Sequence, residues 1–254
     1  MRIVVIGGTG LIGSQVVRGL IEHGHAAVAA APGTGVNTLT GEGLAEALEG
    51  ADAVVDVSNS PSFADDAAME FFRTATANLL AAEAAAGVGH HVALSVVGTE
   101  RLAEQSGYFR AKLAQESLIR DGAVPHTIVR ATQFFEFVRG IADAATEGAV
   151  VRVAPVQFQP IASADVAEAV SITAVGRPEQ GIAEIAGPQR YRLDELIRTA
   201  LTARGDRRTV LADPRARYWG AELADDTLVP TAGATLFGAQ FEEWLLAASA
   251  HDLK

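Results

Sequence analysis

The chain has 254 residues, a formal net charge of -11 and no cysteine. Its length suits one α/β domain, or one domain with a small appended region, and the lack of cysteine excludes disulfides, thiolate catalysis and cysteine metal sites. The acidic excess argues against nucleic-acid binding, which needs clustered Lys and Arg. No apolar stretch approaches the roughly 20 residues of a membrane span, and the first strand leaves no room for a signal peptide. We therefore expect a soluble, cytoplasmic protein without a membrane partner.

The first predicted elements are a buried strand, a glycine turn and a helix. Residues 3–6 are Ile-Val-Val-Ile, a β-branched run typical of a strand inside a parallel sheet. A GxxGxxG motif and a helical spacing of apolar residues follow. Glycines let a diphosphate approach the backbone, and free N–H groups at a helix start face the anion. The alternative interpretation of the motif is a plain tight turn. The predicted dinucleotide-binding residues of this segment are Gly7, Thr9, Gly10, Leu11, Ile12 and Gly13.

Strands and helices then alternate along the chain. The expected strands lie at 25–30, 53–57, 91–96, 127–130, 149–153 and 182–185. The expected helices lie at 44–48, 69–86, 108–120 and 133–146, with two more starting near Asp165 and Leu193. This alternation implies right-handed crossovers and a doubly wound parallel sheet of the Rossmann type. We expect a single domain over residues 1–254, in which about 150–254 forms a small substrate-side region.

The pattern loosens over residues 213–238, a stretch with two prolines that also contains Tyr218 and Trp219. A final helix is expected around 241–248. In doubly wound proteins, late segments often cover the carboxyl edge of the sheet, where ligands bind. We interpret the stretch as part of a substrate pocket; the alternative is a lid that only stabilises the sheet edge.

A second motif combines a tyrosine and a lysine. Tyr108 and Lys112 stand four residues apart at the start of a predicted helix, so both side chains lie on one helix face. Ser95 ends the strand upstream. With only two lysines and three tyrosines in the chain, a YxxxK match by accident is uncommon. The alternative interpretation is an ordinary aromatic residue at a helix start and a solvated lysine.

Across nearly its whole length the sequence resembles the short-chain dehydrogenase/reductase superfamily, specifically its atypical, NmrA-like branch. The matching segments share the family's order and lie at 7–13, 78–82, 93–97, 108–112 with Glu116, 127–130, 160–167 and 185–188. The resemblance implies NAD(P) binding by the first half and a variable pocket built by the second. This fold often pairs through long exposed helices, so a homodimer is the expected assembly.

The resemblance also implies catalytic roles. In that family the tyrosine is the general acid or base at the substrate carbonyl or hydroxyl, the lysine holds the nicotinamide ribose and lowers the tyrosine pKa, and the serine orients the substrate oxygen. These roles fall on Tyr108, Lys112 and Ser95. A phenol of pKa about 10 exchanges protons poorly at neutral pH without a nearby cation. The family's catalytic asparagine is not assigned, because Asn78 belongs to another motif. Asn59, which follows the third strand, is predicted either to line the cofactor or to be a turn residue.

The end of the second strand bears on the choice of cofactor. NAD enzymes usually place Asp or Glu there, whereas NADP enzymes place Arg nearby. Residues 28–35 contain neither and offer small residues and the hydroxyl of Thr34. Because a missing carboxylate removes repulsion against a 2′-phosphate, we expect NADP, with NAD as the alternative.

Three further residues are predicted to bind substrate. Gln133, Phe134 and Phe137 follow the fifth strand, where the family builds its substrate pockets, although the spacing requires at least one phenylalanine of this segment to be core. The adjacent His90 and His91 point to opposite faces of a strand, and no third ligand is close in sequence. We therefore expect a structural histidine pair and no metal.

Two functions remain open at this point. The first is an NAD(P)H-dependent oxidoreductase that reduces a small carbonyl or quinone-like compound, with Tyr108 protonating the reduced oxygen. The second is a non-catalytic NmrA-like sensor that binds dinucleotide, motivated by the incomplete catalytic set and the unspecialised end of the second strand. A nucleotide-sugar epimerase is less favoured, because the C-terminal region is short for a sugar-nucleotide domain. No sequence feature names the substrate.

Overall fold

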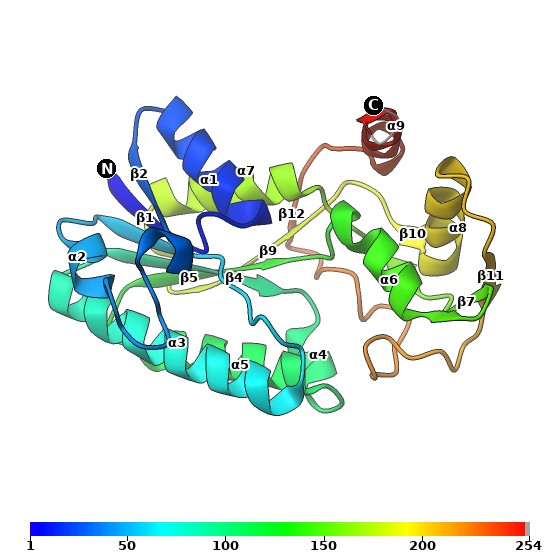
Figure 1. Cartoon of the computed structure of the whole chain (residues 1–254), viewed down its shortest axis with the longest axis horizontal. Helices are drawn as coiled ribbons and strands as arrows, with labels where there is room; N and C mark the ends of the chain where they lie inside the picture. Colours follow the sequence, from blue (N-terminus) through cyan, green and yellow to red (C-terminus); the bar gives the residue numbers. More distant parts are fainter. Residues whose placement is uncertain (252–254) are drawn as a thin grey trace. The chain divides into compact units, whose positions relative to one another are not determined.

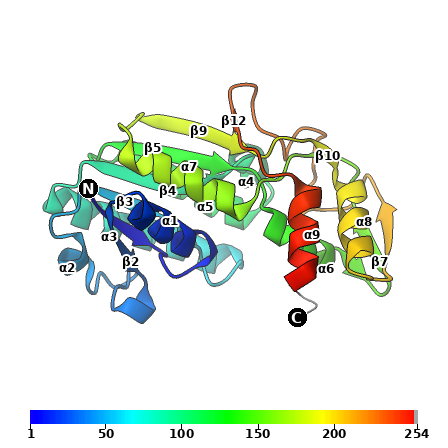
Figure 2. The ribbon, with the colours of Figure 1, turned by 90° about the horizontal axis from the view of Figure 1, so that it is seen from above.

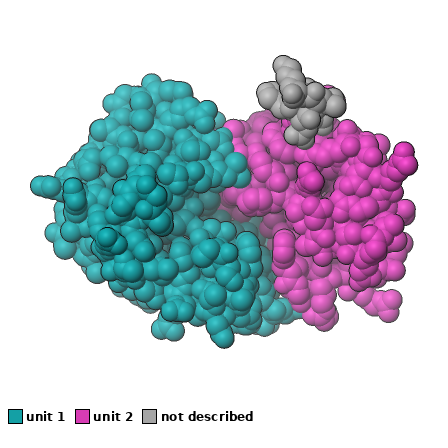
Figure 3. Space-filling view, viewed as in Figure 1, with its two compact units in different colours: residues 1–130, 166–183 teal, residues 131–165, 184–254 magenta. Residues whose placement is uncertain are grey.

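The computed structural model describes residues 1–251, with side chains described to residue 248. The chain forms two compact units (Figure 3). Unit 1 comprises residues 1–130 and 166–183, and unit 2 comprises residues 131–165 together with the chain from residue 184 onward. That the chain acts as one domain stays a prediction.

A seven-stranded parallel sheet lies at the centre of the fold, in the order β12-β9-β5-β4-β3-β1-β2. Its strands are β1 (Arg2–Ile6), β2 (Ala26–Ala30), β3 (Ala53–Asp56), β4 (His90–Val96), β5 (His126–Ala131), β9 (Gly181–Ala186) and β12 (Thr235–Leu236). In the register, Val4 of β1 lies opposite Val28 of β2 and Val54 of β3. The reversal of strand order between β1 and β3 confirms the predicted Rossmann-type doubly wound sheet.

Helices cover both faces of the sheet in unit 1. Figures 1 and 2 show α1 (Leu11–Glu22) and α7 (Ser163–Val175) on one face. The opposite face carries α3 (Asp65–Ala86) and α5 (Gly107–Asp121), which pack side by side (Figure 1). The shorter elements are η1 (Pro32–Thr34), α2 (Leu44–Leu48) and α4 (Thr99–Ala103).

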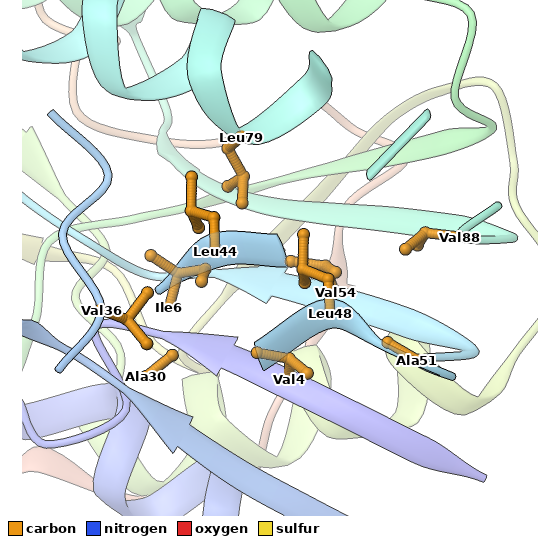
Figure 4. Packing of buried hydrophobic residues seen from close by; sticks show 10 residues of the cluster. All are labelled: Val4, Ile6, Ala30, Val36, Leu44, Leu48, Ala51, Val54, Leu79 and Val88. Carbon is orange, nitrogen blue, oxygen red and sulfur yellow. The ribbon is translucent and has the colours of Figure 1, made fainter. Parts of the chain in front are cut away.

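The core of unit 1 follows from the apolar run of β1. Ile3, Val4 and Val5 are fully buried, as expected for a strand covered on both faces. Alternate side chains face opposite sides of the sheet, so Val4 and Ile6 join one cluster (Figure 4). Leu44 and Leu48 of α2 and Leu79 of α3 complete this cluster. The cluster fixes the carboxyl end of β1, where the glycine turn begins.

Unit 2 combines two small sheets with helices. One sheet contains β6 (Thr146–Glu147), β7 (Val150–Val153) and β11 (Thr209–Ala212), and the other pairs β8 (Gln157–Phe158) with β10 (Tyr191–Arg192). The helical elements of the unit are η2 (Phe135–Phe137), α6 (Val138–Ala144), α8 (Leu193–Ala203) and α9 (Phe241–His251). Within the unit, α8 packs against both α6 and α9.

The helix predicted at 133–146 is wrong in its first turns. Residue Phe134 is extended and bridges Ile161, and only the later part of the segment forms η2 and α6. The N–H of Ile161 donates to the carbonyl oxygen of Gln133, and the N–H of Phe135 donates to that of Ile161, each at 2.9 Å. Backbone pairing with a distant segment thus replaces the helical hydrogen bonds. Within residues 1–251, no helix combines the length and apolar character required to cross a bilayer.

Candidate cofactor and catalytic site

The glycine turn joins β1 closely to α1. Gly7 has a φ of 78°, a conformation that side chains disfavour, and its N–H donates to the carbonyl oxygen of Ala30 at 2.9 Å. A Cβ at Gly13 would lie 2.2 Å from the carbonyl oxygen of Gly7. Only glycine therefore allows the first turn of the helix to lie against the loop.

The start of α1 presents free backbone donors. The N–H of Ser14 donates to the carbonyl oxygen of Gly10, so the N–H groups of Leu11, Ile12 and Gly13 precede the first helical hydrogen bond. The first turn contains no acidic residue, and both Thr9 and Gly10 are exposed. Close backbone approach, N–H groups without an intrahelical partner and the positive end of the helix dipole fit the pyrophosphate of a dinucleotide.

Thr34 closes the turn that follows β2. Its hydroxyl accepts the N–H of Ala31 at 2.9 Å and lies 3.0 Å from the carbonyl oxygen of the same residue. The hydroxyl thus has a local role in η1, and its contact with a cofactor stays a prediction. The segment from Ala26 to Gly35 contains no carboxylate and no arginine.

Tyr108 lies at the start of α5 among aromatic side chains. Its ring centroid is 5.2 Å from that of Phe63 and 6.0 Å from that of Phe72. Its hydroxyl donates to Oδ1 of Asn59 at 3.1 Å, so the structure brings together two of the predicted site residues. Burial raises the pKa of Tyr108 to about 12, although the hydrogen bond to Asn59 opposes this shift. Tyr108 is therefore a protonated phenol throughout the neutral range.

Lys112 occupies a buried polar network one turn further along α5. Its Nζ donates to the carbonyl oxygen of Leu94 at 2.9 Å and to Oε1 of Gln115, and lies 4.6 Å from the centroid of the Phe72 ring. Nε2 of Gln115 donates in turn to Oδ2 of Asp56 at 3.0 Å. Burial lowers the pKa of Lys112 to about 8, while Asp56 and Glu116 act in the opposite direction.

Ser95 belongs to a different network. Its hydroxyl donates to Oε1 of Glu116 at 2.5 Å. Glu116 forms an ion pair with Arg130 at 2.5 Å, and Arg130 also binds Glu100 at 3.0 Å. The three predicted catalytic residues thus lie on β4 and α5 but have separate partners: Glu116 for Ser95, Asn59 for Tyr108, and Leu94 and Gln115 for Lys112.

Sequence reasoning did not single out Asp56 and Gln115. Gln115 follows Lys112 by three residues and therefore lies on the same face of α5, so helical spacing could have indicated it. Asp56 ends β3, and the carboxyl end of a parallel strand is where ligands and site residues gather. Their hydrogen bond joins residues that are far apart in sequence, and no local pattern reveals it.

The predicted substrate-binding residues lie in unit 2. The Phe134 and Phe137 rings stack with centroids 5.0 Å apart, and Phe137 is 49% exposed, whereas Phe135 is the core residue. The side chain of Gln133 is 6% exposed, and neither its Oε1 nor its Nε2 has a partner among the described residues. The same holds for the hydroxyl of the buried Thr132. Other buried polar atoms of the described residues are also without a partner, among them both ring nitrogens of His126 and the hydroxyl of Thr76. A substrate-binding role for Gln133 therefore stays a prediction.

The two adjacent histidines contact protein groups on different elements. Nε2 of His90 lies 2.9 Å from the hydroxyl of Thr127, and Nδ1 of His91 lies 2.8 Å from Oε1 of Glu83. Burial opposes the charging of His91, but Glu83 outweighs it and raises the pKa of His91. Within the part of the chain that the structure describes, no group of His, Asp and Glu residues is arranged to hold a metal ion.

Comparisons with known proteins bear on the family and the fold. The sequence profile of a family described as NAD(P)H-binding matches residues 34–175, more than half of the chain. A (4-alkanoyl-5-oxo-2,5-dihydrofuran-3-yl)methyl phosphate reductase from Streptomyces griseus is 32% identical over 203 residues, which cover 74% of this chain and 68% of the relative.

Solved structures show the same fold at lower identity. A short-chain dehydrogenase/reductase superfamily protein from Agrobacterium tumefaciens with bound NAD has a TM-score of 0.75 at 18% identity, covering 100% of this chain and 97% of that chain. A dTDP-glucose 4,6-dehydratase from Streptomyces venezuelae with bound NAD has a TM-score of 0.73 at 17% identity, covering 98% and 96%. The solved structures show the Rossmann-type fold, and the profile match over more than half of the chain together with the 32% identical relative shows that the chain belongs to the NAD(P)H-binding family.

Proposed function

We propose that the protein is an NAD(P)H-dependent reductase of a small, electron-poor carbonyl or quinone-like compound. The observation that carries the proposal is the protonated phenol of Tyr108 on the same helix as a buried lysine, in a unit whose glycine turn fits a dinucleotide. The similar Streptomyces griseus protein is named as a reductase of a (4-alkanoyl-5-oxo-2,5-dihydrofuran-3-yl)methyl phosphate, whose acyl-substituted, unsaturated oxo-dihydrofuran ring is of this electronic type and also carries a phosphate ester.

Reduction needs a hydride and a proton. When bound, reduced nicotinamide supplies the hydride to the electrophilic carbon. Tyr108 donates its hydroxyl proton to the substrate oxygen that gains negative charge, and solvent restores the proton afterwards. Asn59 accepts the hydrogen bond of the same hydroxyl and orients it. We propose that the positive charge of Lys112, one helical turn away, favours the transient phenolate, because an opposite charge nearby lowers the energy of the anion. In the structure, burial and the hydrogen bond to Asn59 are the two causes that set the pKa of Tyr108.

The unpartnered amide of Gln133 and the stacked pair Phe134 and Phe137 support a substrate-binding role for this segment. The backbone hydrogen bonds of Gln133 and Phe135 with Ile161 hold this segment in place before any ligand binds. A planar, largely apolar substrate with one or two polar groups fits this chemistry.

The cofactor is proposed to be NADPH. Residues 26–35, which include the end of β2, carry no carboxylate that would accept hydrogen bonds from the ribose diol of NAD and repel a 2′-phosphate. NADH is the alternative.

The test is NADPH consumption with a panel of quinones, aldehydes and unsaturated lactones. We expect Tyr108→Phe to lower kcat/KM by a factor of about 10² to 10⁴, because a positioned general acid contributes that much, while NADPH affinity persists. Tyr191→Phe is a matched control, since Tyr191 lies in unit 2 and contacts Gln189 and Glu242. Equal turnover of wild type and Tyr108→Phe would rule out the assigned role.

The second candidate is a dinucleotide-binding sensor without turnover. It is favoured by one observation: Nζ of Lys112 already donates to Leu94 and Gln115. If no member of the panel is reduced while NADPH binds, the sensor becomes the better account. Turnover that disappears in Tyr108→Phe excludes it as the sole function.

A further inference from the structure

A cavity of about 250 Å³ lies wholly inside unit 2, bounded by α6, the end of β7, the start of α8 and residues 216–223. Its walls contain alanines where larger side chains would fill the space: Ala144, Ala145, Ala154 and Ala216. A dry cavity of 150 Å³ is already large enough to bind benzene. The space in unit 2 therefore suits a single ring with a short substituent.

The turn at the edge of this cavity is strained. Tyr218 and Ala221 exchange two backbone hydrogen bonds, of 2.8 and 3.0 Å, so that Trp219 and Gly220 form a two-residue turn. Both central residues have positive φ, 48° for Trp219 and 86° for Gly220. Such turns normally use Asn, Asp or Gly, and a bulky residue with positive φ is an outlier that is characteristic of ligand clamps.

The strained residue places an aromatic ring at the cavity. Trp219 is a lining residue and is 52% exposed, so about half of its surface is accessible to solvent. The neighbouring ring of Tyr218 meets it edge to face, with centroids 6.4 Å apart at 82°. Two perpendicular aromatic walls offer a face and an edge to a flat ring.

The charge of the lining selects a neutral ligand. Among the described lining residues, Arg217 is the one charged side chain. Its guanidinium forms an ion pair with Glu222 at 2.8 Å and donates to the carbonyl oxygen of Gly220 at 2.9 Å. Because this charge is already compensated, an anionic ligand would lose hydration without gaining a free cation.

The geometry points to a second binding site in unit 2, which takes a small, neutral, flat-ringed molecule and holds it against Trp219. From the sequence, residues 213–238 are predicted to form part of a substrate pocket or a lid. The site proposed here differs from that substrate pocket, because its ligand binds without coenzyme and is not reduced. Its occupancy is therefore independent of the proposed function, and the two can fail separately.

Tryptophan fluorescence tests the site without coenzyme. The chain has two tryptophans, Trp219 and Trp244, and the latter stacks on Phe241 in α9. In a Trp244→Phe variant, the emission reports Trp219 alone. We expect anisole, which hydride cannot reduce, to change this emission saturably. Benzoate, an anion of similar size, should bind about tenfold more weakly or worse.

Two variants distinguish a site from general aromatic association. Ala145→Leu narrows the cavity, and combined with Trp244→Phe it should weaken anisole binding about tenfold or more. In Trp219→Phe, the remaining Trp244 emission should not respond. A saturable response that is lost in Ala145→Leu supports the site. Any of three results overturns the site: the emission of Trp219 shows no saturable response to anisole, benzoate binds as tightly as anisole, or the folded Ala145→Leu variant binds anisole with unchanged affinity.

Discussion

Tyr108 and Lys112 share α5 but respond to burial in opposite ways. Burial raises the pKa of Tyr108 to about 12, so the phenol keeps its proton at neutral pH and needs a positive charge nearby to release it to the substrate. Burial lowers the pKa of Lys112 to about 8, so this side chain changes charge close to neutral pH. In the proposal, Tyr108 therefore supplies the proton, and the charge of Lys112 sets the pH dependence.

The charge of Lys112 gives a pH prediction. If the protonated lysine favours the reaction, kcat/KM falls as the pH rises through about 8, because deprotonation removes the positive charge. Asp56 raises the pKa of Lys112, so Asp56→Asn should move this fall to lower pH. The exposed Asp52 binds the N–H of Arg2, and Asp52→Asn is the control that should leave the profile unchanged. An Asp56→Asn profile identical to wild type would contradict the assignment.

Gln133 gives a prediction that separates a binding role from a structural role. Its buried amide has no described protein partner, so Gln133→Met removes an unsatisfied group of similar size. We expect the free energy of unfolding in urea to stay level or to rise by about 1 kcal/mol, while KM for substrate increases. A loss of more than about 1 kcal/mol would instead show that the amide stabilises the fold.

At the scale of elements, the turn after β2 carries the cofactor preference. Gly33 is exposed, and a Cβ there meets no atom within 4 Å, so a side chain fits. Gly33→Asp should weaken NADPH binding about tenfold, because like charges repel at short range, while NADH binding is retained. Gly33→Asn has nearly the same shape without the charge and should leave both affinities close to wild type. The dissociation constants can be measured by quenching of protein fluorescence.

How far the sequence predicts an element depends on where its hydrogen bonds go. The β1 strand and the α1 helix could be predicted because their apolar periodicity and the glycines between them are local signals. The extended conformation at Phe134 could not, because it is fixed by pairing with Ile161 in a distant segment. Similarly, the YxxxK spacing indicates that Tyr108 and Lys112 share a helix, whereas the contact of Tyr108 with Asn59 depends on the tertiary fold.

At the scale of the whole molecule, the two units carry different kinds of residue. Unit 1 holds the glycine turn, Asn59, Tyr108 and Lys112. It also includes residues 166–183, because the chain enters unit 2 at residue 131 and returns to unit 1 at residue 166. Unit 2 holds the segment with the unpaired Gln133 amide and the cavity at Trp219. The resemblance implied this division between a cofactor-binding half and a variable half. The homodimer stays a prediction.

The whole account depends on a nicotinamide dinucleotide held by backbone N–H groups at the start of α1. Calorimetric titration with NADPH and NADH tests this most directly, using Gly13→Ala as the disrupted variant and Gly140→Ala, where a Cβ meets nothing within 4 Å, as the control. We predict saturable one-to-one binding by wild type and Gly140→Ala, and its loss in Gly13→Ala. Absence of binding by wild type with either coenzyme at millimolar concentration would contradict the account.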